Sequence, residues 1–190
     1  MSRVYITSDL HLGHTNVLKF SNRPHDTVEE MFESLKAQWN AVVTKRDIVW
    51  ILGDVAWSQQ WAMRVGELNG RLRLVMGNHD NKMGKGAHKP YESVHGAVRY
   101  KGCILTHIPI HPSEFHGWRY NIHGHMHNDT IDDHRYINVN MDVTKSYVPL
   151  AFDDVLERAE KRAIAILRDD SAVGNALLYN SVKRIRAKEK

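Results

Sequence analysis

The feature that most constrains this chain is an apolar run that stops abruptly at polar residues of three kinds. Leu72 to Met76 is followed by Gly77, and then by Asn78, His79 and Asp80. A short apolar run bounded by a breaker is typical of a buried strand, and a glycine at its end lets the backbone turn sharply. The polar side chains are therefore expected at the C-terminal edge of a sheet, where α/β proteins place their ligands. Taken alone, the pattern fits an ordinary turn equally well, because Asn and Asp favour turns.

The same arrangement recurs at four other points, so that five strand-like runs end in Asp, Asn or His. The five ends are Asp9-Leu10-His11, Gly53-Asp54, Gly77-Asn78-His79, His107 and Gly124-His125-Met126-His127. In the Asp-x-His and His-x-His motifs, alternate residues of an extended segment lie on the same side, so both can point into one site. A polar residue at a single strand end is more often a cap, but five in this order favour a shared site.

Together these strand ends offer two carboxylates, one amide oxygen and four or five imidazoles. That is too many for one metal ion and about right for two ions that share a carboxylate. Oxygen and nitrogen ligands without a thiolate suit Mn²⁺, Fe or Zn²⁺. The chain contains 13 histidines spread along its length, and histidine is the commonest metal ligand in proteins. The residues themselves therefore predict a metal site with two ions.

Between the motifs, the pattern alternates between strands and helices. Strands are expected at 3–8, 47–52, 71–76, 97–100, 103–106, 120–123 and 135–139. Helices are expected from Asp26 or Thr27 to about Val43, from Ser58 to Asn69, from about Val155 to Leu167 after a cap at Asp153 or Asp154, and over 175–188. The alternation up to residue 76 predicts an α/β fold. No repeat or linker divides the chain, so a single domain over residues 1–190 is expected.

The composition narrows the class of protein further. No run of 18 apolar residues is present, the N-terminus lacks a signal-peptide pattern, and Cys103 is alone in a strand-like context. We therefore expect a cytoplasmic protein without a membrane span. The formal charge of +4 comes from the last eight residues, which hold five Lys or Arg and one Glu. A charged terminal helix is usually a solvated face, so this is weak evidence for nucleic-acid binding.

The ordered motif set from Asp9 to His127 resembles that of the calcineurin-like metallophosphoesterase superfamily, while the residues after about Asp142 carry no part of it. The resemblance implies a four-layer αββα sandwich, with two mixed β-sheets flanked by helices and a two-metal site at the strand ends. By position, Asp9, His11 and His127 would hold one metal, Asn78, His107 and His125 would hold the other, and Asp54 would bridge both. His79 would lie near the phosphate and assist the leaving group, so His79 and Asp54 are the expected catalytic residues.

The function that this implies is hydrolysis of phosphodiester or phosphomonoester bonds, for example in a nucleotide. Two divalent metal ions, Mn²⁺ first and Fe, Zn²⁺ or Ni²⁺ as alternatives, would lower the pKa of a shared water, and the hydroxide would attack phosphorus in line. Activity should fall in acid, because the ligands must be deprotonated. Two alternatives remain: a metal-dependent nuclease that uses the basic C-terminal helix, and a non-catalytic scaffold of the same fold, which should have lost ligands or the catalytic histidine. A hydrolase with a single metal ion is expected instead if one of the two ions binds weakly.

Candidate substrate contacts lie in the loops around the motifs. His14 and Arg23 follow the first motif, and an arginine near a phosphate can bind it with two hydrogen bonds. His111 lies in the loop after His107. Trp57 and Trp118 could reach a substrate base or the rim of the site. The sequence contexts of Trp39, Trp50 and Trp61 predict buried core positions.

One departure from the family pattern concerns the residue that orients the catalytic histidine. Some relatives have an acidic residue shortly after the Gly-Asp motif, but here Gly53-Asp54 is followed by Val55, Ala56 and Trp57. Asp80, adjacent in sequence to His79, could orient that ring or could only cap the turn.

Overall fold

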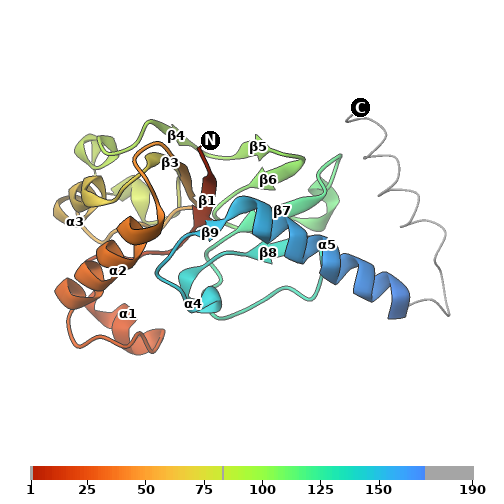
Figure 1. The fold of residues 1–190 in the computed structure, drawn as a ribbon, viewed down its shortest axis with the longest axis horizontal. Coiled ribbons are helices and arrows are strands. Elements are labelled where there is room, and N and C mark those ends of the chain that lie inside the picture. Colours follow the sequence, from red (N-terminus) through yellow and green to blue (C-terminus); the bar gives the residue numbers. More distant parts are fainter. Residues whose placement is uncertain (1, 83, 170–190) are drawn as a thin grey trace.

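The computed structural model describes residues 2–82 and 84–169, which form two β-sheets and the helices that flank them (Figure 1). The first sheet has the strand order β4-β3-β2-β1-β9. Its strands are β1 (Val4–Thr7), β2 (Ile48–Ile51), β3 (Arg71–Val75), β4 (Ser93–His95) and β9 (Leu150–Ala151). Neighbouring strands are parallel except β9, which runs antiparallel to β1.

The second sheet has the order β5-β6-β7-β8 among the described residues. Its strands are β5 (Val98–Tyr100), β6 (Cys103–Leu105), β7 (Tyr120–His123) and β8 (Tyr136–Asn138). β5 and β6 form an antiparallel pair, whereas β6, β7 and β8 are parallel. Both sheets are therefore mixed, and in each the parallel strands bring their C-terminal ends to one edge.

The helices begin where a polar side chain can satisfy a free backbone N–H group. They are α1 (Thr15–Phe20), α2 (Val28–Val42), α3 (Gln59–Arg64), α4 (Met141–Thr144) and α5 (Phe152–Asp169). The side chains of His14, Thr27, Ser58 and Asn140 accept N-capping hydrogen bonds at the starts of α1 to α4. Short 3₁₀ turns occupy Val65–Glu67, Asp80–Lys82, Lys85–His88 and Pro112–Glu114.

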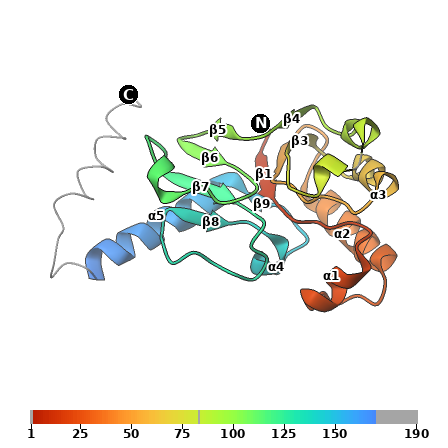
Figure 2. The ribbon, with the colours of Figure 1, turned by 180° about the vertical axis from the view of Figure 1, so that it is seen from behind.

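Two apolar cores lie on opposite faces of the first sheet. One packs β1 to β3 against α2 and α3, and the other lies between the two sheets and includes the start of α5. Along β2, Val49 and Ile51 enter the first core, while Trp50 and Leu52 enter the second. The strand is apolar throughout because both of its faces are buried. Figures 1 and 2 show α2 and α3 at one end of the molecule and α5 lying across β7 and β8.

The predicted arrangement of two mixed sheets flanked by helices is confirmed. The sequence analysis missed α1, α4, β4 and β9, which are short and lack a clear hydrophobic period. It also began the last described helix too late: Asp153 and Asp154 lie in the first turn of α5. The helix expected at 175–188 lies outside the described residues. Among the described helices, none combines the length and apolar character that a membrane span requires.

The first core supplies a test of packing. Trp39 of α2 is fully buried, and its indole N–H donates a hydrogen bond of 2.8 Å to the carbonyl of Asn69. We expect Trp39→Phe to lower the free energy of unfolding by at least about 1–3 kcal/mol, since the carbonyl loses its partner inside the protein. Urea denaturation would measure this loss. The exposed Met63→Ala in α3 is the control, with an expected change within about 0.5 kcal/mol; equal effects of the two variants would contradict the prediction.

Candidate metal centre

The predicted ligands lie on the loops that follow β1, β2, β3, β6 and β7, and hydrogen bonds between these loops bring them together. The backbone N–H groups of Asp9 and His11 donate to the carbonyls of Gly53 and Asp54, at 3.0 Å each. Across the two sheets, the backbone N–H of His125 donates to Asp9 Oδ2 at 3.0 Å. The two sheet edges therefore meet at one site.

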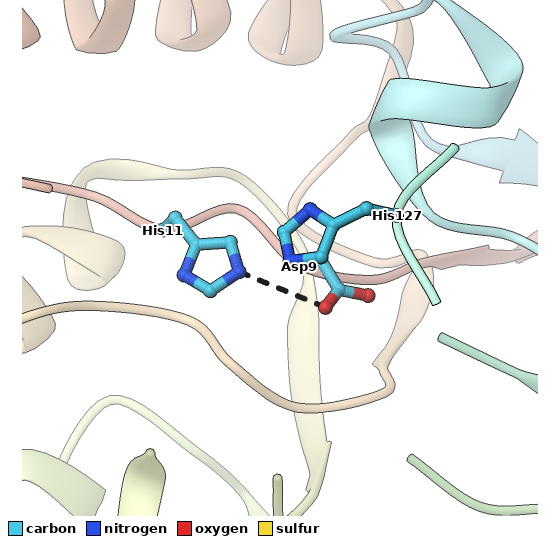
Figure 3. A group of neighbouring side chains, drawn as sticks. All are labelled: Asp9, His11 and His127. Atoms are coloured by element: carbon cyan, nitrogen blue, oxygen red, sulfur yellow. Dashed lines mark ion pairs between the residues drawn. The ribbon is translucent and has the colours of Figure 1, made fainter. Parts of the chain in front are cut away.

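The first ligand group consists of Asp9, His11 and His127. Each offers one ligand atom, and these atoms lie within 4.8 Å of one another (Figure 3). Asp9 Oδ1 lies 3.7 Å from His11 Nε2, and both atoms are buried without a hydrogen-bond partner among the described residues. Buried polar atoms without a partner are rare because each costs about 1–3 kcal/mol. A cation between them would satisfy both, so the donor set fits a metal ion.

The second group consists of Asp54, His107 and His125, again with ligand atoms within 4.8 Å of one another. The side-chain oxygen of Asn78 lies 3.0 Å from His107 Nε2, which brings the amide to the same group. His107 Nδ1 lies 2.7 Å from the carbonyl of Leu52. Because a carbonyl only accepts, Nδ1 carries the proton in the neutral ring, and Nε2 is left with the lone pair that a metal needs.

Asp54 lies between the two groups. Its Oδ1 is 3.4 Å from His107 Nε2, and its Oδ2 is 4.0 Å from His11 Nε2. Burial alone would raise the pKa of this carboxyl, but the His107 ring, when protonated, donates a hydrogen bond and contributes a positive charge. Together with the backbone N–H of His79, it holds the pKa of Asp54 at about 2. Asp54 is therefore ionised at neutral pH and contacts a histidine of each group, as a bridging ligand must.

Five of the ligand residues adopt left-handed backbone conformations. The φ angles are 60° at Asp9, 49° at His11, 50° at Asp54, 69° at His125 and 47° at His127. This region costs a residue with a Cβ atom about 1–2 kcal/mol. Such strain persists only where the surrounding structure enforces it, and it concentrates at functional sites. Here it turns the chain so that the ligand side chains face the same space.

The glycines of two motifs are explained by close approach of the carboxylates. A Cβ atom at Gly77 would lie 2.2 Å from Asp54 Oδ1, and a Cβ atom at Gly124 would lie 2.2 Å from Asp9 Oδ2. Any other residue would displace a carboxylate of the candidate centre. The glycine before Asn78 and the glycine before His125 therefore make room for ligands as well as turning the backbone.

Asp142 in α4 is a residue of the site that the sequence analysis missed. Its Oδ2 accepts a hydrogen bond of 2.8 Å from His127 Nδ1, which leaves the other ring nitrogen of His127 for a metal. Burial would raise the pKa of Asp142, but the hydrogen bonds from His127 and Arg23 lower it well below its usual range. The same hydrogen bond raises the pKa of His127. Nothing in the sequence distinguishes Asp142 from other acidic residues outside the motifs.

Arg23 occupies a different place from the substrate contact expected of it. Its side chain is buried and forms an ion pair of 2.8 Å with Asp142. Its two terminal nitrogens donate to the carbonyls of Leu10 and Asp9, at 2.7 and 2.9 Å. The guanidinium therefore stabilises the loop after β1, because each of its three nitrogens already donates to a protein partner.

The two alternatives for Asp80 are resolved in favour of the turn. Its carboxylate is buried and accepts hydrogen bonds of 2.7–3.0 Å from the backbone N–H groups of Asp54, Val55 and Gly77. Burial nevertheless raises the pKa of this carboxyl. The carboxylate next to the His79 ring is Asp54, with Oδ2 3.7 Å from His79 Nε2. Asp80 therefore fixes the loops after β2 and β3 to each other.

The remaining candidates differ in how close they lie to the ligands. The ring of His14 is 5.8 Å from that of His11, and its Nδ1 accepts the backbone N–H of Val17. Burial lowers the pKa of His14, with added repulsion from His11 and His79. His111 is exposed, and its ring pairs with Ser113 within the loop after β6. The structure thus brings His14 to the ligand groups and shows only local contacts for His111.

Comparisons with known proteins show the family of this chain and agree with its fold. The model of the calcineurin-like phosphoesterase family matches residues 2–181, so the chain belongs to that family. Uncharacterized protein MJ1445 of Methanocaldococcus jannaschii is 35% identical, over 85% of this chain and 93% of its own. Gene 66 protein of Mycobacterium phage L5 is 34% identical, over 69% and 80%. The crystal structure of AQ665 from Aquifex aeolicus, a protein of unknown function, shares the fold, with a TM-score of 0.65 and 22% identity over 83% and 99%.

The contact between Asp142 and His127 leads to a prediction for metal binding. Asn at position 142 keeps one acceptor oxygen, so it cannot serve both Arg23 and His127. We expect Asp142→Asn to weaken Mn²⁺ binding by about 10–100-fold, because His127 loses the group that fixes its orientation. Calorimetric titration of the metal-free protein would measure the affinity. Ser21→Ala is the control, since it removes another hydrogen bond to Asp142 and leaves His127 untouched. Unchanged affinity in a folded Asp142→Asn protein would contradict the assignment.

Proposed function

We propose that this protein is a phosphohydrolase that uses two divalent metal ions to cleave phosphodiester or accessible phosphomonoester bonds. The observation that supports the proposal most directly is the position of Asp54, which contacts histidines of two separate ligand groups. Mn²⁺ is the first choice for both positions, and Fe, Zn²⁺ and Ni²⁺ are alternatives, because the donors are oxygen and nitrogen. In this proposal Asp9, His11 and His127 hold one ion, Asn78, His107 and His125 hold the other, and Asp54 contacts both.

Bound metal ions would supply charge stabilisation at the phosphoryl oxygens and lower the pKa of the attacking water. The chain itself supplies His79. Its ring is half-buried beside the Asp54 carboxylate, and its backbone N–H donates to Asp54 Oδ1 at 3.0 Å. A histidine in this position can donate a proton to the leaving oxygen while the carboxylate keeps the ring in place.

The described side chains favour direct attack by water over a covalent intermediate. Cys103 is buried in β6, and burial raises the pKa of its thiol to about 12, so it is a poor nucleophile. Ser8 is fully buried beside Asp9, and its hydroxyl lies within hydrogen-bond distance of the carbonyl of Leu52. Neither group is free to attack a phosphoryl centre.

The two alternatives from the sequence are supported less well. The nuclease that relies on a basic C-terminal helix depends on residues 183–190, which lie outside the described residues. A non-catalytic scaffold is expected to have lost ligands or the catalytic histidine, but every ligand of both groups is present, and His79 lies beside Asp54.

The proposal is tested by hydrolysis of bis(p-nitrophenyl) phosphate and p-nitrophenyl phosphate by the full chain loaded with Mn²⁺. We expect release of nitrophenolate from at least one of them, and we expect a chelator to abolish it. The proposal is refuted if neither ester is cleaved faster than by Asp54→Asn protein prepared in the same way.

Asp54→Asn and His79→Ala should separate metal binding from proton transfer. Asp54→Asn should weaken the binding of both metal ions and abolish turnover, because the shared ligand loses its charge. His79→Ala should retain two metals per chain and lower kcat by about 10²–10⁴-fold, as is usual when an acid or base group is lost. Elemental analysis of the metal content alongside kcat distinguishes the two outcomes. Loss of metal in His79→Ala would show that this ring is a ligand.

A further inference from the structure

A cleft opens directly beside His79, and none of the residues that line it is a proposed metal ligand. Its volume is about 320 Å³, and it is lined by Ala56, Trp57, Ser58, Gln59, His79 and Lys82. These residues come from the loop after β2, the start of α3, and the segment after β3. Because His79 belongs both to the cleft and to the surroundings of Asp54, a molecule in the cleft would adjoin the reacting phosphate.

Trp57 is fixed at the wall of this cleft with half of its surface exposed. Its backbone N–H donates to the carbonyl of Leu12 at 2.9 Å. The ring of His14 contacts the indole edge-to-face, with ring centres 4.0 Å apart, and the ring of His79 lies tilted against it at 5.0 Å. The indole is therefore held between two histidines of the candidate site, while half of its apolar surface remains accessible to a ligand.

The other side chains of the cleft suit an anionic ligand with polar edges. Lys82 makes no ion pair within the described ranges, so its charge is uncompensated. The amide of Gln59 makes no hydrogen bond in the part of the chain that the structure describes, and it lies at the wall of the cleft against Gly86, where a Cβ atom would meet its Nε2. It can donate and accept, as a base edge requires. None of the six lining residues is a carboxylate, so nothing in the wall repels a phosphate.

We propose that this cleft binds the nucleoside part of a nucleotide ester, with the base stacked on Trp57 and a phosphate next to Lys82. The proposal rests on the proposed function, since it assigns the substrate class of the same site. A half-exposed indole, an amide in the wall and a cation match the base, its polar edge and its phosphate. A simple alkyl or sugar phosphate would leave the exposed indole without a partner. Stacking on an aromatic ring accepts every base, so the subsite selects nucleotides as a class.

The test compares AMP with ribose 5-phosphate, which has the same sugar and phosphate but no base. Calorimetric titration of the Mn²⁺-loaded full chain should show that AMP binds more tightly. Trp57→Ala should lower the affinity for AMP by about 5–150-fold, the range found when a stacking ring is removed from a nucleic-acid-binding protein. The affinity for ribose 5-phosphate should stay unchanged. Trp57→Phe should restore part of the AMP affinity, because a smaller ring still stacks. Phe20→Ala is the control, because it removes an exposed aromatic side chain in α1 that does not line the cleft, and it should change the affinity for neither ligand.

A second comparison identifies the source of the nucleotide. If a single-stranded oligonucleotide binds more tightly than AMP and is weakened equally by Trp57→Ala, the ligand is a polynucleotide. If AMP binds at least as tightly, the ligand is a free nucleotide. Both results support the subsite. Equal affinities for AMP and ribose 5-phosphate, or an unchanged ratio in Trp57→Ala, would overturn it.

The same proteins separate this inference from the proposed function. Hydrolysis of bis(p-nitrophenyl) phosphate with no dependence of AMP binding on Trp57 would leave the phosphohydrolase standing and remove the nucleoside subsite. Base-dependent AMP binding without hydrolysis of either nitrophenyl ester would leave the nucleoside subsite standing and refute the phosphohydrolase. Fluorescence offers a readout that is independent of turnover: AMP should quench the emission of the wild-type chain, and Trp57→Phe should lose that quenching.

Discussion

The candidate centre depends on backbone conformations that its own residues disfavour. Five ligand residues have positive φ, at a cost of about 1–2 kcal/mol each. The cost is offset by hydrogen bonds, several of which run between different loops. The loop after β1 donates to the carbonyls of Gly53 and Asp54, and the carboxylate of Asp80 accepts three N–H groups from the loops after β2 and β3. The strain can therefore persist only when all of these strand ends are assembled.

The ion pair between Arg23 and Asp142 extends this constraint to the second half of the chain. Breaking a buried pair by removing one partner is costly, at about 3–5 kcal/mol, because the other charge is left alone. Here each charge has further partners. Arg23 donates to two carbonyls of the loop after β1, while Asp142 also accepts from Ser21 and His127. The pair therefore joins the first strand end, α4 and the ligand His127 in one buried network.

The sequence predicts the strand ends well because each one is a local pattern. An apolar run, a glycine and a ligand lie within a few residues, as in Val75 to His79, and the structure places that glycine where a Cβ atom would meet Asp54. The family resemblance predicted the paired sheets, which are confirmed. Contacts between distant residues were not predictable in this way. Arg23 and Asp142 are 119 residues apart, so no periodicity links them, and Arg23 was interpreted as a substrate contact because its neighbours belong to a motif.

Short elements escaped prediction for a different reason. β9 has two residues, and it is defined by pairing with Tyr5 and Ile6 of β1 rather than by any pattern of its own. α4 has four residues, begins at the cap supplied by Asn140, and is the element that carries Asp142 to His127. Asp142, which orients His127, thus came from an element with no sequence pattern of its own, whereas the ligands follow strands that are marked by apolar runs.

The distribution of charge and exposure also determines the side from which a substrate can approach. The side chains of His11, His107 and Asp54 are at most 6% exposed, whereas those of His79 and His127 are 30% and 40% exposed. The buried side carries the carboxylates of Asp9 and Asp54, and the nearby guanidinium of Arg23 is already paired with Asp142. A phosphate would be repelled there unless cations were bound, since like charges in a low-dielectric site repel strongly. The cleft beside His79 lies on the exposed side, and Lys82 supplies a positive charge there without a carboxylate in the wall. Anion binding at this site therefore depends on prior metal binding, and His79 lies at the boundary between the two.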